Sequence, residues 1–103
     1  MAAGAVALVA AACIGEPPEV TVDDPELQEG RNIYGSACAA CHGADGGGGS
    51  GPKLSDGAVT AAYPDIADQI ELVTNGRGQM PAYVGRLSDE QIRAVVRYTR
   101  EIL

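Results

Sequence analysis

The amino-acid sequence predicts a small all-α domain. Three stretches place apolar residues at helical spacing, and no stretch alternates apolar and polar residues as a half-buried strand does. The chain has 103 residues, which is enough for one domain at most. A domain of this size has a limited hydrophobic core.

The first helix is expected to begin after Asp24 and to run into Cys38. Asp24 can cap the helix, and Pro25 suits its first position because proline fixes the backbone there and lacks an N–H. The residues at helical spacing within it are Leu27, Gly30, Ile33, Tyr34 and Ala37.

Two further helices follow a Gly-rich loop. Residues 64–75 predict one, with Pro64 at its start and Gly76 at its end. The last helix should begin at Ser88, which forms a capping box with Gln91. Its apolar face consists of Ile92, Val95, Val96, Thr99 and Ile102.

Cys38, Cys41 and His42 form a C-x-x-C-H motif, which is typical of covalent attachment of a c-type haem. Each thiol can add across one vinyl group of the porphyrin, and the two-residue spacing lets one helical turn present both sulfurs. The imidazole that follows can bind the iron through one nitrogen, while the other needs a hydrogen-bond acceptor. A buried porphyrin would also supply apolar mass to a chain that has neither Trp nor Phe.

Two other kinds of site use a C-x-x-C pair. A structural zinc site needs four ligands, and outside the motif the chain offers only Cys13 and no second histidine. Such a site would therefore need a second chain. A thioredoxin-like dithiol needs a βαβ context, whereas the flanking residues predict helix and Gly-rich loop. Haem attachment is the favoured interpretation.

Met80 is the candidate sixth ligand of the iron. It is the only methionine besides Met1, and it lies in a Gly- and Pro-containing loop, where methionine as core filler is less expected. A thioether ligand raises the reduction potential. With both axial positions filled the iron suits electron transfer, whereas an open position would suit a haem peroxidase or a small-molecule-activating enzyme. The sequence shows no acid–base pair or nucleophile constellation, which favours a carrier over an enzyme.

Over residues 24–103 the chain resembles the class I bacterial cytochromes c, which hold one haem between histidine and methionine. The matching elements are Gly30 and Tyr34, residues 38–43, Gly51 and Pro52, residues 80–82, and Val95 with Tyr98. The resemblance implies an all-α cytochrome c fold, with three main helices and loops wrapped around one haem (heme c). The haem would be attached through Cys38 and Cys41, and its iron bound by His42 and Met80.

The resemblance implies roles for other residues. The Pro52 carbonyl would accept a hydrogen bond from His42. Gly30 would let the first and last helices cross closely, with Tyr98 at the contact. The glycines of residues 46–49 would wrap beside the porphyrin, or would form only a flexible loop.

Residues 1–15 carry no charged side chain. The apolar run is shorter than the about 20 residues that span a bilayer, and its length suits the core of a secretory signal. Residues 9–13 loosely resemble a lipoprotein processing site, which would leave Cys13 lipidated; the alternatives are a signal peptide or truncated membrane anchor, and a plain buried segment. A lipoprotein, a signal peptide or a membrane anchor would each favour the periplasm or the outer face of the cytoplasmic membrane.

Residues 16–23 are interpreted as a tether, because prolines and charges discourage packing and favour extended backbone, so the folded domain is expected to be 24–103.

The net charge of −7 is unevenly distributed. Residues 16–71 contain eleven acids and two bases, whereas residues 77–103 contain three acids and five arginines. Nucleic acid is therefore not an expected partner. The acidic charge either orients docking onto a basic partner or only keeps the surface soluble.

The expected function is one-electron transfer between membrane or periplasmic redox partners, and the alternative is a haem subunit fixed in a larger respiratory or photosynthetic complex.

Overall fold

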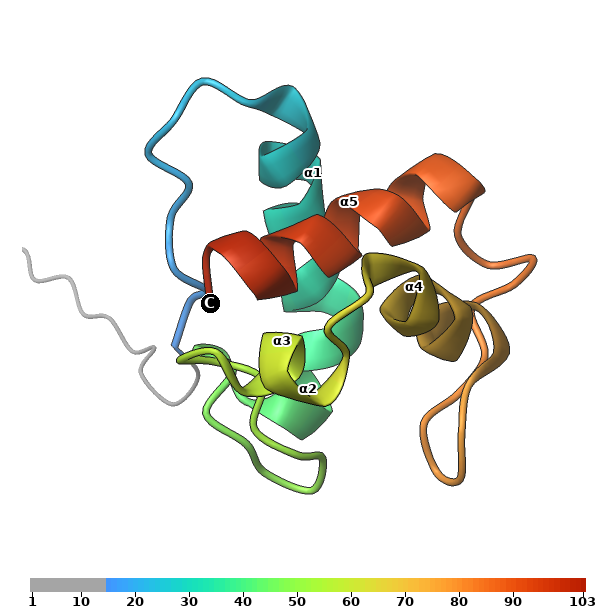
Figure 1. The fold of residues 1–103 in the computed structure, drawn as a ribbon. Coiled ribbons are helices and arrows are strands. Elements are labelled where there is room, and N and C mark those ends of the chain that lie inside the picture. Colours follow the sequence, from blue (N-terminus) through green and yellow to red (C-terminus); the bar gives the residue numbers. More distant parts are fainter. Residues whose placement is uncertain (1–14) are drawn as a thin grey trace, which may run out of the picture.

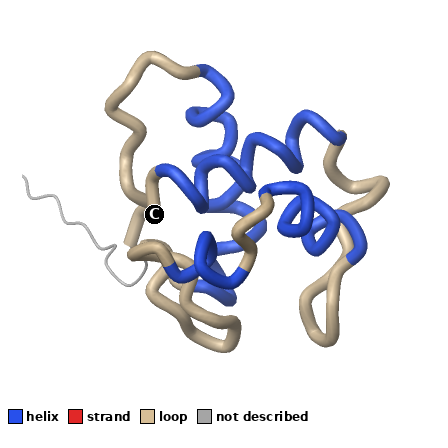
Figure 2. Tube along the Cα trace, in the orientation of Figure 1, coloured by secondary structure: helices blue, strands red, loops and turns tan. Residues whose placement is uncertain are grey.

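The computed structural model describes residues 15–103 as helices joined by loops (Figures 1 and 2). The elements are α1 (Pro25–Ile33), the π-helix η1 (Tyr34–Cys38), α2 (Ala39–His42), α3 (Ala58–Ala62), α4 (Ile66–Asn75) and α5 (Asp89–Glu101). Within residues 15–103 the extended pairing is limited to isolated bridges, so the all-α prediction is confirmed. No helix in that range has the length and apolar character needed to cross a bilayer.

The first predicted helix is a continuous helical stretch from α1 through η1 to α2. Asp24 caps it as expected, because its Oδ1 accepts a hydrogen bond from the Leu27 N–H at 3.1 Å. The wider turn of η1 ends at Cys38, the first residue of the C-x-x-C-H motif, and the Ala39 N–H donates to the Tyr34 carbonyl across it. The motif therefore lies at the carboxyl end of the longest helical stretch of the described chain.

Helices α1 and α5 cross in direct backbone contact (Figure 1). A Cβ placed on Gly30 would overlap the Ala94 carbonyl oxygen and would lie 2.8 Å from Tyr98 Cβ, so only glycine allows this approach. The fully buried rings of Tyr34 and Tyr98 pack beside the crossing, with centroids 5.6 Å apart. The expected role of Gly30 is confirmed.

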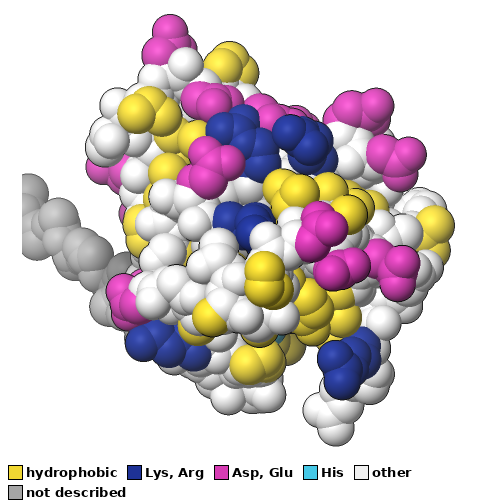
Figure 3. Space-filling view, viewed as in Figure 1, with side chains coloured by type: hydrophobic (Ala, Val, Ile, Leu, Met, Phe, Trp, Pro, Cys, Tyr) yellow, Lys and Arg dark blue, Asp and Glu magenta, His cyan; other side chains and the backbone are white. Residues whose placement is uncertain are grey.

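An ion-pair network closes the same crossing from the surface. Arg97 of α5 donates to Asp24 Oδ2 at 2.9 Å, to Glu26 Oε1 at 2.6 Å and to Glu101 Oε2 at 2.7 Å. These contacts hold the pKa of Asp24 and of Glu101 below their ordinary values, chiefly through the hydrogen bonds from Arg97. Basic and acidic side chains lie next to one another on this face of the molecule (Figure 3).

The predicted start of α5 is accurate, whereas the start of α4 is two residues later than expected. Ser88 and Gln91 form the complete capping box. Helix α4 begins at Ile66 and not at Pro64, because the Asp65 carboxylate caps it by accepting from the Ala67 N–H at 2.9 Å. The short helix α3 was not expected, since Gly57 precedes it without any side-chain cap.

Residues 16–23 form neither helix nor strand, but the expectation that this segment does not pack is wrong. Val20 is only 8% exposed and belongs to the core beside α1 and α5. Arg31 donates to the Pro17 carbonyl at 2.8 Å, and the Tyr98 hydroxyl donates to the Pro18 carbonyl at 2.6 Å. Proline carbonyls remain good acceptors, so these two donors attach the segment to the domain. Cys13 and the rest of residues 1–14 lie outside the described part of the chain.

Candidate cofactor site

A cavity of about 540 Å³ brings the predicted site residues together. Cys38, Cys41 and His42 reach it from η1 and α2, Pro52 from the loop after α2, and Met80 from the loop between α4 and α5. The rest of its wall is mostly apolar: Leu54, Val59, Leu72, Val73, Val95 and Val96. An apolar cavity of this kind, with a few polar groups converging on it, is typical of a cofactor site.

The His42 imidazole is oriented by the backbone of the following loop. Its Nδ1 lies 2.8 Å from the Pro52 carbonyl oxygen. A carbonyl only accepts hydrogen bonds, so Nδ1 carries the proton and Nε2 is left with a free lone pair for a metal. Gly51 allows the close approach, because a Cβ there would lie 2.9 Å from His42 Cε1.

Cys38 and Cys41 are both free thiols, not joined in a disulfide. Burial, together with the neighbouring Cys41, raises the pKa of the Cys38 thiol to about 11. Cys38 is therefore an uncharged thiol at neutral pH. Within residues 15–103 no group of three or more His, Cys, Asp or Glu side chains could hold a metal ion, so a zinc site here would need ligands from a second chain.

Met80 lies at the end of a tight turn. The N–H of Arg77 donates to the Met80 carbonyl and the N–H of Met80 donates to the Arg77 carbonyl, each at 3.0 Å. Gly78 takes the positive φ of 59° that the turn needs. The Tyr83 hydroxyl donates to the Ala37 carbonyl at 3.1 Å, which ties the Met80 loop to the helix that carries Cys38.

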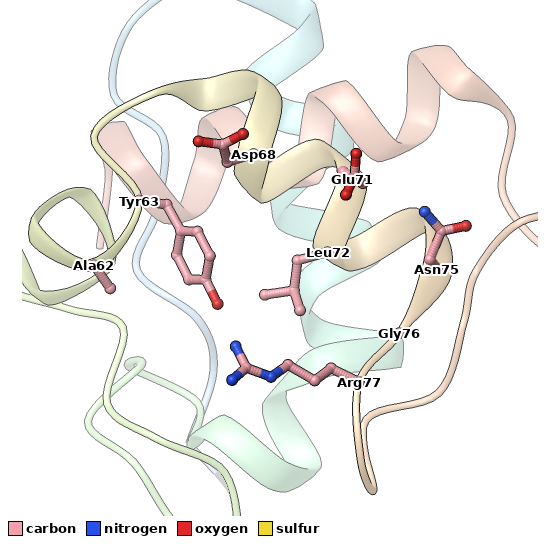
Figure 4. Close-up of a pocket in the computed structure, with 8 residues that line it drawn as sticks. All are labelled: Ala62, Tyr63, Asp68, Glu71, Leu72, Asn75, Gly76 and Arg77. Carbon is pink, nitrogen blue, oxygen red and sulfur yellow. The ribbon is translucent and has the colours of Figure 1, made fainter.

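A second hollow, of about 470 Å³, lies beside the cavity (Figure 4). It shares Tyr63, Leu72 and Arg77 with the cavity, and the Arg77 guanidinium extends toward the Tyr63 hydroxyl. Its other side chains include the carboxylates of Asp68 and Glu71. It contains none of the thiol, imidazole and thioether donors, so the chemistry of this molecule lies in the cavity.

Two features of the cavity differ from the sequence-based expectations. Its wall includes Gly51 and Pro52, but none of the glycines 46–49, which instead pack within their own loop and against Leu103 and Lys53. Its wall also includes Gln69, which is not among the site residues predicted from the sequence. The sequence contains a signal for it, because Gln69 lies three residues after Ile66 and four before Val73, the spacing of the apolar face of α4.

The donor set fits a c-type haem. Two free thiols and an imidazole with a free Nε2 lie at one side of an apolar cavity, and a thioether lies on the loop that also lines it. The described residues contain no cluster of three or more His, Cys, Asp or Glu side chains, which a zinc site within one chain would need.

Comparison with known proteins gives the same result. The family model described as "Cytochrome C oxidase, cbb3-type, subunit III" matches residues 25–98. The chain is 46% identical to cytochrome c6 of Leptolyngbya boryana over 71 residues, which cover 67% of this chain and 84% of that protein. It is 38% identical to the cbb3-type cytochrome c oxidase subunit FixP of Azorhizobium caulinodans over 84 residues, 78% of this chain but only 28% of that subunit.

Solved structures share the fold. Cytochrome c6 from the diatom Phaeodactylum tricornutum superposes with a TM-score of 0.60 at 36% identity, covering 71% of this chain and 88% of that one. Cytochrome cL from Methylophaga aminisulfidivorans gives a TM-score of 0.66 at 28% identity, covering 78% of this chain and 57% of that one. The chain therefore belongs to the class I cytochrome c family: it is an electron-transfer protein that carries a covalently bound c-type haem.

Proposed function

We propose that the chain carries single electrons on a haem attached through Cys38 and Cys41, with His42 and Met80 as the axial ligands. The observation that carries this proposal is the convergence of these side chains on one apolar cavity. Pro52 completes the site, because its carbonyl holds the imidazole in the tautomer that leaves Nε2 free.

A c-type haem supplies an iron that gains or loses one electron. The residues of this chain allow that change of charge with little movement of the ligands. His42 and Met80 come from two separate segments that are each fastened by hydrogen bonds, so both can keep their positions when the charge changes. The apolar wall excludes water, and electron transfer needs no proton donor or nucleophile.

Mass spectrometry of protein from a host that matures c-type cytochromes tests the attachment. We expect one haem mass on the polypeptide, retained after denaturation and extraction with acidified organic solvent. The matched variant Cys38→Ser with Cys41→Ser should lose it. Release of the pigment from the wild-type chain into the solvent would contradict the proposal.

We propose that redox partners bind over the Met80 loop. Residues 76–88 contain two arginines and no acid, although the chain as a whole has a net charge of −7. None of the residues that line the cavity is Asp or Glu. Val84 is 62% exposed on the same loop, and Arg86 lies over the Tyr83 ring at 5.6 Å. This surface fits a partner with an apolar patch bordered by acidic groups, so the acidic charge of the other residues serves solubility.

Small redox reagents of opposite charge test the sign of this surface. Arg86→Glu should slow reduction by anionic hexacyanoferrate(II) several-fold and should speed electron exchange with cationic hexaammineruthenium, more strongly at low salt. Arg93→Glu, on the outer face of α5, is the control and should change both rates less. Equal effects of the two variants would contradict a docking surface at the Met80 loop.

We propose that the protein works outside the cytoplasm and is held at the membrane by residues 1–15, by a lipid on Cys13 or by an uncleaved apolar segment. The proposal rests on the apolar, uncharged composition of these residues. The mass of the mature protein from membranes tests it. A lipid on an N-terminal Cys13 or an intact apolar segment supports attachment, whereas a chain starting after Cys13 contradicts it.

A second candidate function is a haem subunit fixed in a respiratory complex. The match to the family model of cbb3-type oxidase subunit III favours it, although the chain spans 28% of the FixP subunit that it resembles. Purification after mild detergent extraction separates the two. A mobile carrier should elute free of other redox subunits, and a fixed subunit should elute with them in constant ratio.

A further inference from the structure

Gln69 is a buried polar side chain in a mostly apolar part of the cavity wall. It lies on α4, is 4% exposed, and has Leu72 and Val73 beside it in the wall. An amide at such a position costs free energy unless its polar atoms are hydrogen-bonded. Aliphatic side chains fill the neighbouring positions, so packing alone does not explain an amide here.

Hydrogen bonds fix the orientation of this amide. The Gln69 Oε1 accepts from Arg100 Nη1 at 3.0 Å, and its Nε2 donates to Thr99 Oγ1 at 2.8 Å. Thr99 Oγ1 in turn donates to the Val96 carbonyl at 2.8 Å. The oxygen and nitrogen ends of the amide therefore cannot exchange places without breaking both bonds.

Arg100 is held in place by the backbone before α4. Its Nη1 also donates to the Tyr63 carbonyl at 2.7 Å, and its Nη2 donates to the Pro64 carbonyl at 3.1 Å. The planar guanidinium makes these three contacts together, which a lysine ammonium on a flexible stem reproduces poorly. Arg100 thus connects the amide to a rigid frame.

One donor of the amide is left over. A primary amide nitrogen has two N–H groups, and within residues 15–103 Nε2 has a single protein acceptor, Thr99. Gln69 lines the cavity, as does Thr99. The acceptors at the periphery of a haem are its two carboxylates.

We propose that Gln69, oriented by Arg100, donates its second N–H to a carboxylate of the haem and thereby favours the reduced state. This inference rests on the haem occupying the cavity as proposed above. Reduction adds one negative charge, and a fixed N–H dipole with its positive end toward the haem stabilises that charge in a low-dielectric site. Gln69 is then a potential-setting residue, and Arg100 is a positioning residue that acts through it.

Reduction potentials of four variants test the proposal. We expect Gln69→Leu to lower the equilibrium constant for reduction at least twofold. This corresponds to a reduction potential lower by about 18 mV, because a tenfold change equals 59 mV for one electron. Arg100→Lys keeps the charge but loses the planar contacts, so it should shift the potential in the same direction. Combined with Gln69→Leu, it should add little, because it acts through the amide. Arg97→Met, on the same helix but outside the cavity, is the control and should leave the potential unchanged.

The outcomes are separable from those of the proposed function. A wild-type protein without thioether-bound haem or with an open axial position contradicts the function itself. If the low-spin spectrum is intact and Gln69→Leu leaves the potential unchanged, the inference is wrong while the function stands. If Arg100→Lys shifts the potential equally with and without Gln69, Arg100 does not act through the amide and that part of the inference is wrong.

Discussion

Helix α5 packs against protein alone on one side, whereas on its other side it borders the cofactor cavity. On one side, α5 meets α1 and the segment before it, and the contact is filled by protein alone: Gly30 brings the backbones together, and Tyr34 and Tyr98 are fully buried. On the other side, α5 packs against α4 through Val73, Ile92 and Val96, and both helices line a cavity of about 540 Å³ together with the Met80 loop. The first side can pack without a cofactor, whereas the second needs the haem to fill its core.

Loss of the haem should therefore have the largest effect, and mainly on the second side. We expect Cys38→Ser with Cys41→Ser to abolish the cooperative thermal transition, because the cavity wall loses its apolar partner. Hydrogen exchange should show protection lost first in α4 and residues 76–88, with more retained where α1 crosses α5. A haem-free variant with the melting behaviour and exchange pattern of the wild type would contradict the comparison.

Gly30→Ala should have the next largest effect, and on the first side. The added methyl group meets Ala94 backbone atoms that cannot move without separating the helices, so we expect a loss of about 3 kcal/mol in the free energy of unfolding. Denaturant titration measures it. Asn32→Ala, at an exposed position of α1, is the control and should change stability little. An equal, small effect of both variants would mean that the crossing is looser than described.

Many features on both sides of α5 can be predicted from the sequence, because they depend on residues that are close together in the chain. The caps at Asp24 and Ser88, the glycine that ends α4 and the C-x-x-C-H motif each depend on residues a few positions apart. The close approach at Gly30 required the family resemblance, because it joins residues more than 60 positions apart. The identity of the residues that bind the iron remains a prediction.

Other features depend on contacts that no local pattern specifies. Residues 16–23 have the composition of a tether, but Arg31 and Tyr98 from distant positions bind their carbonyl groups. Helix α3 is short and lacks a side-chain cap. Gln69 follows the apolar spacing of α4 although it is polar, and its role depends on Arg100, 31 residues later.

Acid should lower the stability of the contact between α1 and α5, because it protonates the carboxylates that bind Arg97. Arg97 lowers the pKa of Asp24 below 3.8 and of Glu101 below 4.5, so these carboxylates contribute stability above their unfolded pKa values and lose it as the pH falls through the folded values. We expect Arg97→Met to lower stability at pH 7 by less than Gly30→Ala does, and to flatten the loss of stability below about pH 4.5. Unfolding curves from pH 7 to pH 2.5 measure this. An acid dependence as steep as that of the wild type would exclude the network as its source.

The smallest effect is expected for Tyr98→Phe, which removes one hydrogen bond from the segment before α1. The Pro18 carbonyl still accepts from Arg31, so the loss should be about 1 kcal/mol. Faster proteolysis within residues 16–23, with an unchanged reduction potential, would accompany it. Resistance equal to that of the wild type would show that the segment is held by Val20 and Arg31 alone.

The visible spectrum of Met80→Ala is the most direct test of the central claim, that one haem is bound in the cavity between His42 and Met80. The wild-type protein should be low-spin in both oxidation states and should not respond to carbon monoxide. Met80→Ala should lose the low-spin spectrum, bind carbon monoxide when reduced and have a lower reduction potential, while Gln79→Ala on the same turn should behave as the wild type. An unchanged low-spin spectrum and an unchanged potential in Met80→Ala would contradict the account.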